Sequence, residues 1–431
     1  MTRFSQVIDV LRDWATNAPL QPPPGQQQQP VGPRAVFVRD LRGRVRLVAN
    51  WTSKTNPQPA LDLHALDQRL GSFSPGVDEL LWHRDKLSDD AADILQHSDL
   101  RMLTTGPDVG LLERQLIGVD WLRIANINPA APRLSFFGLK GGVGRSTALA
   151  FLAGHLTRKG KRVLAVDLDW ESPGLGALLL PADAEPEFGV VDWFVEDLVG
   201  QADEALLQSS FARTAEGIVV CPAFGKGDEY SLDKLSRAYV EAGGHAPANG
   251  GLTGALRRYL DQIEARHQPD VILIDSRAGL HDLAAAALTQ LGAEALLFVA
   301  DTRQNWEGLR VLFTHWQKRP EALKAFRDRL HLIQALSPVP LNERPAADSL
   351  FRQKAYSLCV DTIYEQNTGD PSAWSFDEAD TDAPHAPVPI RWNAAAQQVD
   401  PGASPEVLQS PEIRVAFEEF LEQVSVIAFP S

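Results

Sequence analysis

Apolar and polar residues follow one another along the chain in blocks that predict alternating strands and helices. The apolar run at residues 134–137 leads into a glycine-rich turn, and an Ala- and Leu-rich stretch from Ser146 to about Lys159 follows it. A second apolar run, at residues 163–166, comes after a short link. Short apolar runs are typical of buried strands, and the longer stretch between them is typical of a helix. The pattern therefore predicts a βαβ crossover with parallel strands.

The same alternation continues to the C-terminal end of the chain. Further apolar runs predict strands at residues 217–224, 271–274, 295–300 and 330–335. Helical patterns lie between and after these runs, at residues 188–199, 232–241, 252–267, 280–291, 305–316 and 411–427. Alternating strands and helices predict an α/β fold, here a doubly wound and mostly parallel sheet. Folds of this class bind ligands at the carboxyl ends of the strands.

The first third of the chain has a different pattern, which predicts a separate small module. It opens with an amphipathic helix at residues 1–18, and a Pro- and Gln-rich tract typical of a linker follows at 19–33. Residues 34–128 combine a hairpin pattern with several short helical patterns, the last at 111–124, where Trp121 and Leu122 are expected to pack against the following domain. We expect these residues to form an α+β module, and residues 129–431 to form the α/β domain.

Composition favours a globular protein in water and argues against disulfide-rich, secreted and membrane-spanning proteins. The chain is 44% hydrophobic and 23% charged, which is typical of a globular protein in water. Cys221 and Cys359 form neither a disulfide framework nor a metal-spaced cluster. No run approaches the roughly 18 apolar residues of a membrane span, and the N-terminus lacks the apolar core of a signal peptide. We therefore expect a cytoplasmic protein that does not enter a membrane.

The charge distribution leaves two interpretations of the N-terminal region open. The net charge of -15 disfavours general attraction to nucleic acid or anionic lipid. Basic residues nevertheless outnumber acidic ones in residues 1–60, chiefly in the hairpin pattern. Such a surface is suited to nucleic acid or to an acidic partner, and equally to a hairpin edge that its charges keep from aggregating.

The glycine-rich turn has the chemistry of a phosphate-binding loop. Gly141, Gly142 and Gly144 permit backbone conformations in which successive amide groups point at one anion. The helix that follows adds the positive end of its dipole. In the general P-loop pattern Ser146 holds the position of the hydroxyl that binds Mg²⁺, and Arg145 holds the position of the lysine.

The sequence KGGVGRST at residues 140–147 resembles the deviant Walker A box, KGGxGK[ST], of the ParA/MinD class of P-loop ATPases. The resemblance implies an ATP-binding loop made of Lys140, Gly141, Gly142, Val143, Gly144, Arg145, Ser146 and Thr147. In that class the early lysine, here Lys140, reaches the phosphates of the partner subunit in a homodimer that encloses ATP. One residue departs from the pattern, because Arg145 is larger and forked where the class has a compact lysine.

Three aspartates match the other boxes of the same class. Asp167 and Asp169, which follow the second strand, match the first switch, with Asp169 at the position that orients the attacking water. Asp275 matches the Walker B aspartate linked to Mg²⁺, and Gly279 matches the second-switch glycine. The resemblance therefore implies Mg²⁺ at Ser146, Asp167 and Asp275, and it extends from about residue 133 to the C-terminus.

The nucleotide base is expected near the loop after residue 335. Pro338 lies where related ATPases hold adenine, and the chain lacks the Asn-Lys-x-Asp box that selects guanine. The resemblance thus favours ATP with Mg²⁺ as cofactors. It implies an ATPase switch that dimerises over the nucleotide and signals to a protein partner through residues 34–128. The alternatives are a nucleotide-sensing scaffold with little turnover, suggested by Arg145, and a metabolic amidoligase or synthetase.

Overall fold

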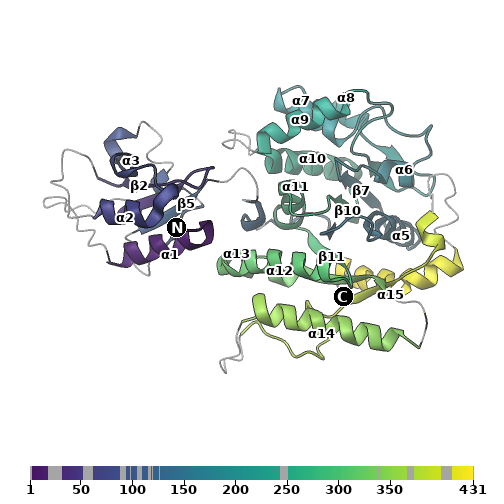
Figure 1. Cartoon of the computed structure of the whole chain (residues 1–431). Coiled ribbons are helices and arrows are strands. Elements are labelled where there is room, and N and C mark those ends of the chain that lie inside the picture. The colour runs from purple at the N-terminus through teal and green to yellow at the C-terminus, as the bar shows by residue number, and fades with distance from the viewer. Residues whose placement is uncertain are drawn as a thin grey trace. The chain divides into compact units, whose positions relative to one another are not determined.

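The computed structural model forms two compact units, Met1–Leu116 and Ile117–Ser431, which are described separately (Figure 1). The domain ranges expected from the sequence stay predictions, and Pro338 and most of the Pro- and Gln-rich tract lie outside the described residues. The structure describes residues 2–17, 32–51, 62–87, 94–97, 99–103, 109–114, 118, 120–125, 127–242, 251–337, 340, 342–365, 373–398 and 410–430.

The first unit is built on a five-stranded sheet with the order β3-β2-β1-β5-β4. Its strands are β1 (Ala35–Arg39), β2 (Val45–Ala49), β3 (Leu81–His83), β4 (Arg101–Met102) and β5 (Val109–Glu113). Its helices are α1 (Phe4–Asn17), α2 (Leu63–Leu70) and α3 (Val77–Leu80). The predicted hairpin is present, since β1 and β2 pair antiparallel and Gly43 takes the positive φ of 83° that their turn requires. Helix α1 packs on this sheet through Trp14, whose ring centroid lies 5.3 Å from that of Phe37.

Several arginines of this hairpin are paired within the unit. Arg39 donates to both carboxylate oxygens of Glu113, each at 2.7 Å. Arg46 lies 3.6 Å from Asp40 and stacks over the ring of Trp82. These pairs favour the interpretation in which the charges stabilise the edge of the hairpin over the one in which they form a free basic face.

The second unit is built on an eight-stranded sheet with the order β13-β12-β11-β6-β10-β7-β9-β8. Its strands are β6 (Arg133–Gly138), β7 (Val163–Leu168), β8 (Ala212–Arg213), β9 (Val219–Cys221), β10 (Val271–Ser276), β11 (Glu294–Ala300), β12 (Leu330–Ser337) and β13 (Val388–Arg391). Among these strands only β8 pairs antiparallel. The predicted doubly wound and mostly parallel α/β fold is confirmed.

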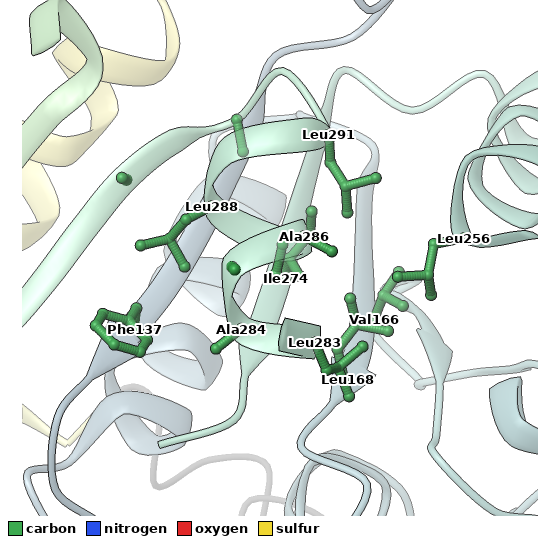
Figure 2. Close-up of a cluster of buried hydrophobic side chains, with 14 of the residues drawn as sticks. Phe137, Val166, Leu168, Leu256, Ile274, Leu283, Ala284, Ala286, Leu288 and Leu291 are labelled. Carbon is green, nitrogen blue, oxygen red and sulfur yellow. The ribbon is translucent and has the colours of Figure 1, made fainter. Parts of the chain in front are cut away.

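Helices cover both faces of this sheet because alternate strand residues point to opposite sides. They are α5 (Arg145–Arg158), α6 (Leu175–Leu179), α7 (Val190–Leu198), α8 (Glu204–Gln208), α9 (Ser231–Ala242), α10 (Gly251–His267), α11 (Asp282–Ala285), α12 (Arg303–Gln317), α13 (Pro320–Lys324), α14 (Arg344–Thr362) and α15 (Pro411–Ala428). On one face α5 and α15 pack on Phe136, and the rings of Phe151 and Phe417 stack at 4.5 Å. On the other face α11 covers Phe137, Val166 and Ile274 (Figure 2).

Helix α15, which corresponds to the helix predicted at residues 411–427, packs on the sheet. Phe420 and Val424 on its apolar stripe are fully buried. Within the described part of the chain, no helix combines the length and the apolarity that crossing a bilayer requires.

Two predicted helices differ from the structure. Residues 111–124 contain the end of strand β5 and a 3₁₀ turn, η3 (Asp120–Leu122), because the apolar run at 109–112 pairs in parallel with β1. A short buried run cannot be assigned to helix or strand by its period alone. Residues 280–291 are helical only from Asp282, and they change from α11 to a π-helical turn, η4 (Ala286–Gln290).

Candidate functional site

The loop between β6 and α5 has the backbone of an anion cradle. Gly142 and Gly144 have φ angles of 75° and 82°, which side-chain-bearing residues rarely adopt. Gly144 caps the N-terminus of α5 and so brings the loop to the positive end of the helix dipole. A Cβ on Gly138 would lie 3.2 Å from the Val143 side chain, a tight contact that favours glycine at the end of the strand. An anion placed in the loop would meet backbone amides with no side chain between.

Two buried aspartates lie side by side at the carboxyl ends of β7 and β10. Asp167 and Asp275 are paired in register across these parallel strands. Asp167 accepts hydrogen bonds from the amides of Asp169, Gly174 and Leu175, at 3.0, 3.1 and 3.0 Å. Burial and the charge of Asp275 nevertheless raise the pKa of Asp167 to about 8. Burial therefore disfavours the charged form of both carboxyl groups, and a cation bound between them would reverse that preference.

Asp275 has the features of a cation ligand. Burial raises its pKa to about 6, although Arg145 and a hydrogen bond from the Ser146 hydroxyl lower it. Its Oδ1 atom is buried and has no hydrogen-bond partner in the structure. Unsatisfied buried acceptors are costly and rare, so this atom is suited to a ligand. A hydroxyl and two carboxylates are oxygen donors of the kind that Mg²⁺ prefers, and the predicted residues Ser146, Asp167 and Asp275 therefore fit that ion.

Arg145 is directed at the strand ends and does not extend into solvent. Its side chain is 7% exposed, its Nη1 donates to the Ser276 carbonyl oxygen at 2.6 Å, and its Nη2 donates to Asp169 Oδ2 at 3.1 Å. Burial raises the pKa of Asp169, while Arg145 opposes that rise. Arg145 therefore holds Asp169 in this structure, a contact that the sequence does not indicate.

The remaining predicted residues lie around the mouth of the same loop. Lys140 and Gly141 are exposed, Val143 is buried and Thr147 is half-buried at the start of α5. The structure thus brings the loop 140–147 together with Asp167, Asp169 and Asp275 at one edge of the sheet. Pro338 lies outside the described residues, so its predicted contact with a base stays a prediction.

A second set of polar residues adjoins Asp169. The sequence indicates Arg277 and His281 beside the second switch, as phosphate sensors or as surface and capping residues, whereas Glu171 and Tyr239 were missed. Glu171 accepts hydrogen bonds from Arg277 and from the Tyr239 hydroxyl. The ring of Tyr239 lies 5.0 Å from that of His281, whose side chain caps α11 by accepting from the Leu283 amide. Glu171 could have been found by its position two residues after Asp169, whereas no local signal marks Tyr239.

A cavity of about 390 Å³ opens beside the loop. Residues 142–147 of the loop, Leu336 of β12 and Phe417 of α15 line part of it. The rest of the lining comes from the end of β13 and the segment after it: Ile390, Arg391, Trp392, Asn393 and Ala396. Trp392 is 42% exposed, and Arg391 is fixed by Asp348 and Glu419. Sequence reasoning missed this segment, although an apolar run followed by Trp-Asn at the end of a parallel strand is a usable signal.

Comparisons with known proteins agree with this arrangement. A family model described as the CobQ/CobB/MinD/ParA nucleotide binding domain matches residues 134–350, about half of the chain. A search of curated proteins gave no match. The matched segment contains the whole loop 140–147, both strands that present the aspartates, and Asp169.

Three solved structures are among those similar to this chain. Cobyrinic acid a,c-diamide synthase from Mycobacterium smegmatis, with bound ATP analog and magnesium, has 21% identity and a TM-score of 0.41, over 69% of this chain and 95% of that chain. The cell division ATPase MinD from Pyrococcus furiosus has 19% identity and a TM-score of 0.41, over 69% and 99%. A ParA family ATPase from Chlorobium tepidum TLS has 15% identity and a TM-score of 0.43, over 70% and 100%.

Proposed function

The chain belongs to the CobQ/CobB/MinD/ParA family of nucleotide-binding domains, and from this premise we propose that it binds ATP with Mg²⁺ and acts as a nucleotide-dependent switch. The observation on which the proposal rests is the convergence of two features at one sheet edge. A glycine loop with two left-handed glycines faces a pair of buried aspartates, one of which has an unsatisfied oxygen. The first feature suits a polyphosphate, and the second suits the cation that accompanies it.

Different residues of the site would bind the phosphates, bind Mg²⁺ and orient the attacking water. The amides of the loop 140–147 would hold the phosphates. Ser146, Asp167 and Asp275 would hold Mg²⁺, which supplies charge neutralisation between the phosphates when it is bound. Asp169 would orient a water molecule for attack on the terminal phosphorus once Arg145 releases it.

The base would enter the cavity beside the loop. Trp392 offers a partly exposed aromatic face there, and aromatic faces stack on nucleobases. Arg391 lines the cavity while it is bonded to Asp348 and Glu419, so its role would be to fix the segment that positions Trp392.

Dimerisation would complete the site. Lys140 is exposed at the rim of the loop, where it is free to approach a second copy of the chain. A cation that arrives from the partner would add positive charge where the transition state gathers negative charge. Release of phosphate would then loosen the dimer and change what the first unit presents to a protein partner.

The second candidate function is a nucleotide sensor with little turnover, and one observation favours it. Arg145 is bonded to Asp169, the residue proposed to orient water. If that ion pair persists when ATP is bound, the chain would bind nucleotide and dimerise but hydrolyse it slowly.

Two measurements on the full chain test the proposal and separate the two candidates. Light scattering after size exclusion, with and without a non-hydrolysable ATP analogue and Mg²⁺, reports dimerisation. Steady-state phosphate release reports turnover. Dimers with phosphate release support the ATPase switch, dimers without it support the sensor, and a chain that stays monomeric with the analogue contradicts both.

A further inference from the structure

The segment that enters the second unit is bound tightly to the body of that unit. We call residues 118–125 the connector, of which residues 118 and 120–125 are described. Trp121 in the turn η3 is 3% exposed, and its ring lies 5.6 Å from Phe137 and 6.1 Å from Trp316. The Trp316 indole donates to the Trp121 carbonyl oxygen at 2.8 Å. Along the chain, the connector is the route from the first unit to the nucleotide-binding domain.

The polar contacts of the connector converge on α11 and η4. The Asp282 carboxylate accepts from the Gly118 amide at 2.5 Å and also from the Asp120 amide. The Thr289 hydroxyl shares its one proton among three carbonyl oxygens, that of Ala285 in its own helical segment at 2.8 Å and those of Asp120 and Arg123 at 3.1 Å. The Ala125 amide donates to the Thr289 carbonyl oxygen at 3.0 Å. The Asp282 carboxylate therefore holds the first residues of the connector, the Thr289 hydroxyl contacts its middle, and the Thr289 carbonyl oxygen holds its last residue, Ala125.

The same helical segment begins seven residues after Asp275 and is tied to the candidate nucleotide site. At the site, the Ser276 carbonyl oxygen accepts from Arg145, and the Gly279 amide donates to the Gly138 carbonyl oxygen at 3.0 Å. His281 then caps α11. Residues 276–281 thus join the site at one end to the anchor of the connector at the other.

Helix α11 and the turn η4 are packed in a way that suits them to move together when nucleotide binds. The side chains of Leu283, Ala284, Ala286 and Leu288 are fully buried against the sheet (Figure 2). Closely packed elements shift between discrete arrangements more readily than they deform, and π-helical turns such as η4 are one place where such a shift can be absorbed. A triphosphate in the loop would compete for Arg145 and for the Gly279 amide, both of which now bond elsewhere.

We infer that occupation of the nucleotide site changes the packing of α11 and η4, and that Asp282 and Thr289 pass this change to the connector. The inference rests on the proposed function. It adds the route by which the effect of nucleotide binding reaches the N-terminal part of the chain. It requires that the connector bind α11 and η4 with different free energies in the two states of the site.

Hydrogen exchange of the full chain tests this inference. Exchange is followed in peptides that cover residues 118–125, with and without Mg²⁺ and the ATP analogue AMPPNP at a concentration that a binding titration shows to be saturating. We expect the exchange rate of these amides to change by about fivefold or more, the lower end of usual coupling factors. Thr289→Val removes the hydroxyl at nearly constant volume and should reduce the change by at least about half while AMPPNP still binds, since only the main-chain bond and Asp282 then hold the connector. Thr289→Ser should retain it.

A matched control uses another buried threonine. Thr362→Val removes a hydroxyl that donates only within α14, to the Leu358 carbonyl oxygen at 2.5 Å, and should leave the change in the connector intact. If Thr289→Val does not fold, Asp282→Ala provides a second break at the other end of the connector, because alanine has no acceptor for the Gly118 amide.

Three results would overturn the inference. The first is AMPPNP binding with no change in exchange at residues 118–125, which leaves the proposed function standing. The second is a change that is undiminished in Thr289→Val or in Asp282→Ala. The third is failure of the wild-type chain to bind AMPPNP at all, which removes the proposed function as well.

Discussion

The side chains of Arg145 and Asp169 form a buried ion pair, with 3.1 Å between Nη2 and Oδ2. The residue at the P-loop lysine position is thereby joined to the residue at the water-orienting position. Because the Nη1 atom of Arg145 also donates to the Ser276 carbonyl oxygen, its fork spans the ends of β7 and β10. Neither residue can take up its proposed role until this pair opens, so the pair is a restraint on turnover.

Substitution of Arg145 tests that restraint. Lysine has a single ammonium and cannot donate to Ser276 and Asp169 with the geometry of a fork, so Arg145→Lys should release Asp169. We predict that kcat for phosphate release rises by about tenfold, which corresponds to about 1.4 kcal/mol of barrier. Arg162→Lys, at an exposed pair with Asp270, is the matched control and should have no effect. An unchanged or lower kcat in Arg145→Lys would show that the pair does not limit turnover.

The aspartate pair should make the stability of the nucleotide-free chain depend on pH. Burial raises the pKa of Asp167 to about 8 and that of Asp275 to about 6, from 3.8. Raised carboxyl pKa values contribute stability that is complete below about pH 4 and is lost as pH rises towards 8, by at most ~1.4 kcal/mol per pH unit for each group. Urea unfolding from pH 4 to 9 should therefore show Asp167→Asn gaining stability relative to wild type as pH rises. A difference that is constant across this range would contradict the assignment.

Lys140 should be needed for turnover and not for folding. It is exposed at the loop, where its proposed role is to neutralise charge in the active site of a partner copy. We predict that Lys140→Ala lowers phosphate release by about 100-fold, the size expected for one electrostatic group in a transition state. The melting temperature should be unchanged. Lys159→Ala, at the exposed C-terminal end of the same helix α5, is the control. Normal hydrolysis and dimerisation by Lys140→Ala would remove the proposed role in trans.

Trp392 should contribute to recognition of the base. Loss of one aromatic stack weakens nucleobase binding by roughly 1–3 kcal/mol, so Trp392→Ala should raise the Kd for ATP by about tenfold or more. Trp392→Phe should restore most of the affinity, and neither change should affect the Kd for inorganic tripolyphosphate. Trp82→Phe, at a tryptophan with similar exposure in the first unit, is the control for intrinsic fluorescence. Equal weakening of ATP and tripolyphosphate would show that Trp392 does not contact the base.

The sequence predicts those parts of the site that depend on the order of apolar, glycine-rich and helical segments along the chain. The loop between β6 and α5 follows from an apolar run, clustered glycines and a helical run in immediate succession. The meeting of Asp167 and Asp275 follows from parallel strands, whose carboxyl ends lie at one edge of a sheet. Both features follow from the spacing of residues along the chain, so they can be predicted without the tertiary structure.

The part that could not be predicted depends on which distant segments become neighbours. Trp392 reaches the loop because β13 lies beyond β12 in the strand order, and nothing local fixes that order. The partner of Arg145 was missed because its charge suits a phosphate as well as Asp169, and only the buried geometry decides between them. Strand β5 was predicted as part of a helix because its apolar run has no period of its own and pairs with β1, some 70 residues away along the chain.

The most direct test of the central claim is a calorimetric titration of the full chain with AMPPNP, in Mg²⁺ and in EDTA, for wild type and for Asp275→Ala. We predict one site per chain for wild type, with an affinity at least about tenfold higher in Mg²⁺ than in EDTA, because the unsatisfied oxygen of Asp275 is a ligand of the cation. Asp275→Ala should bind equally in both buffers. Absence of saturable binding by the wild-type chain, or a magnesium effect that is unchanged in Asp275→Ala, would contradict the account.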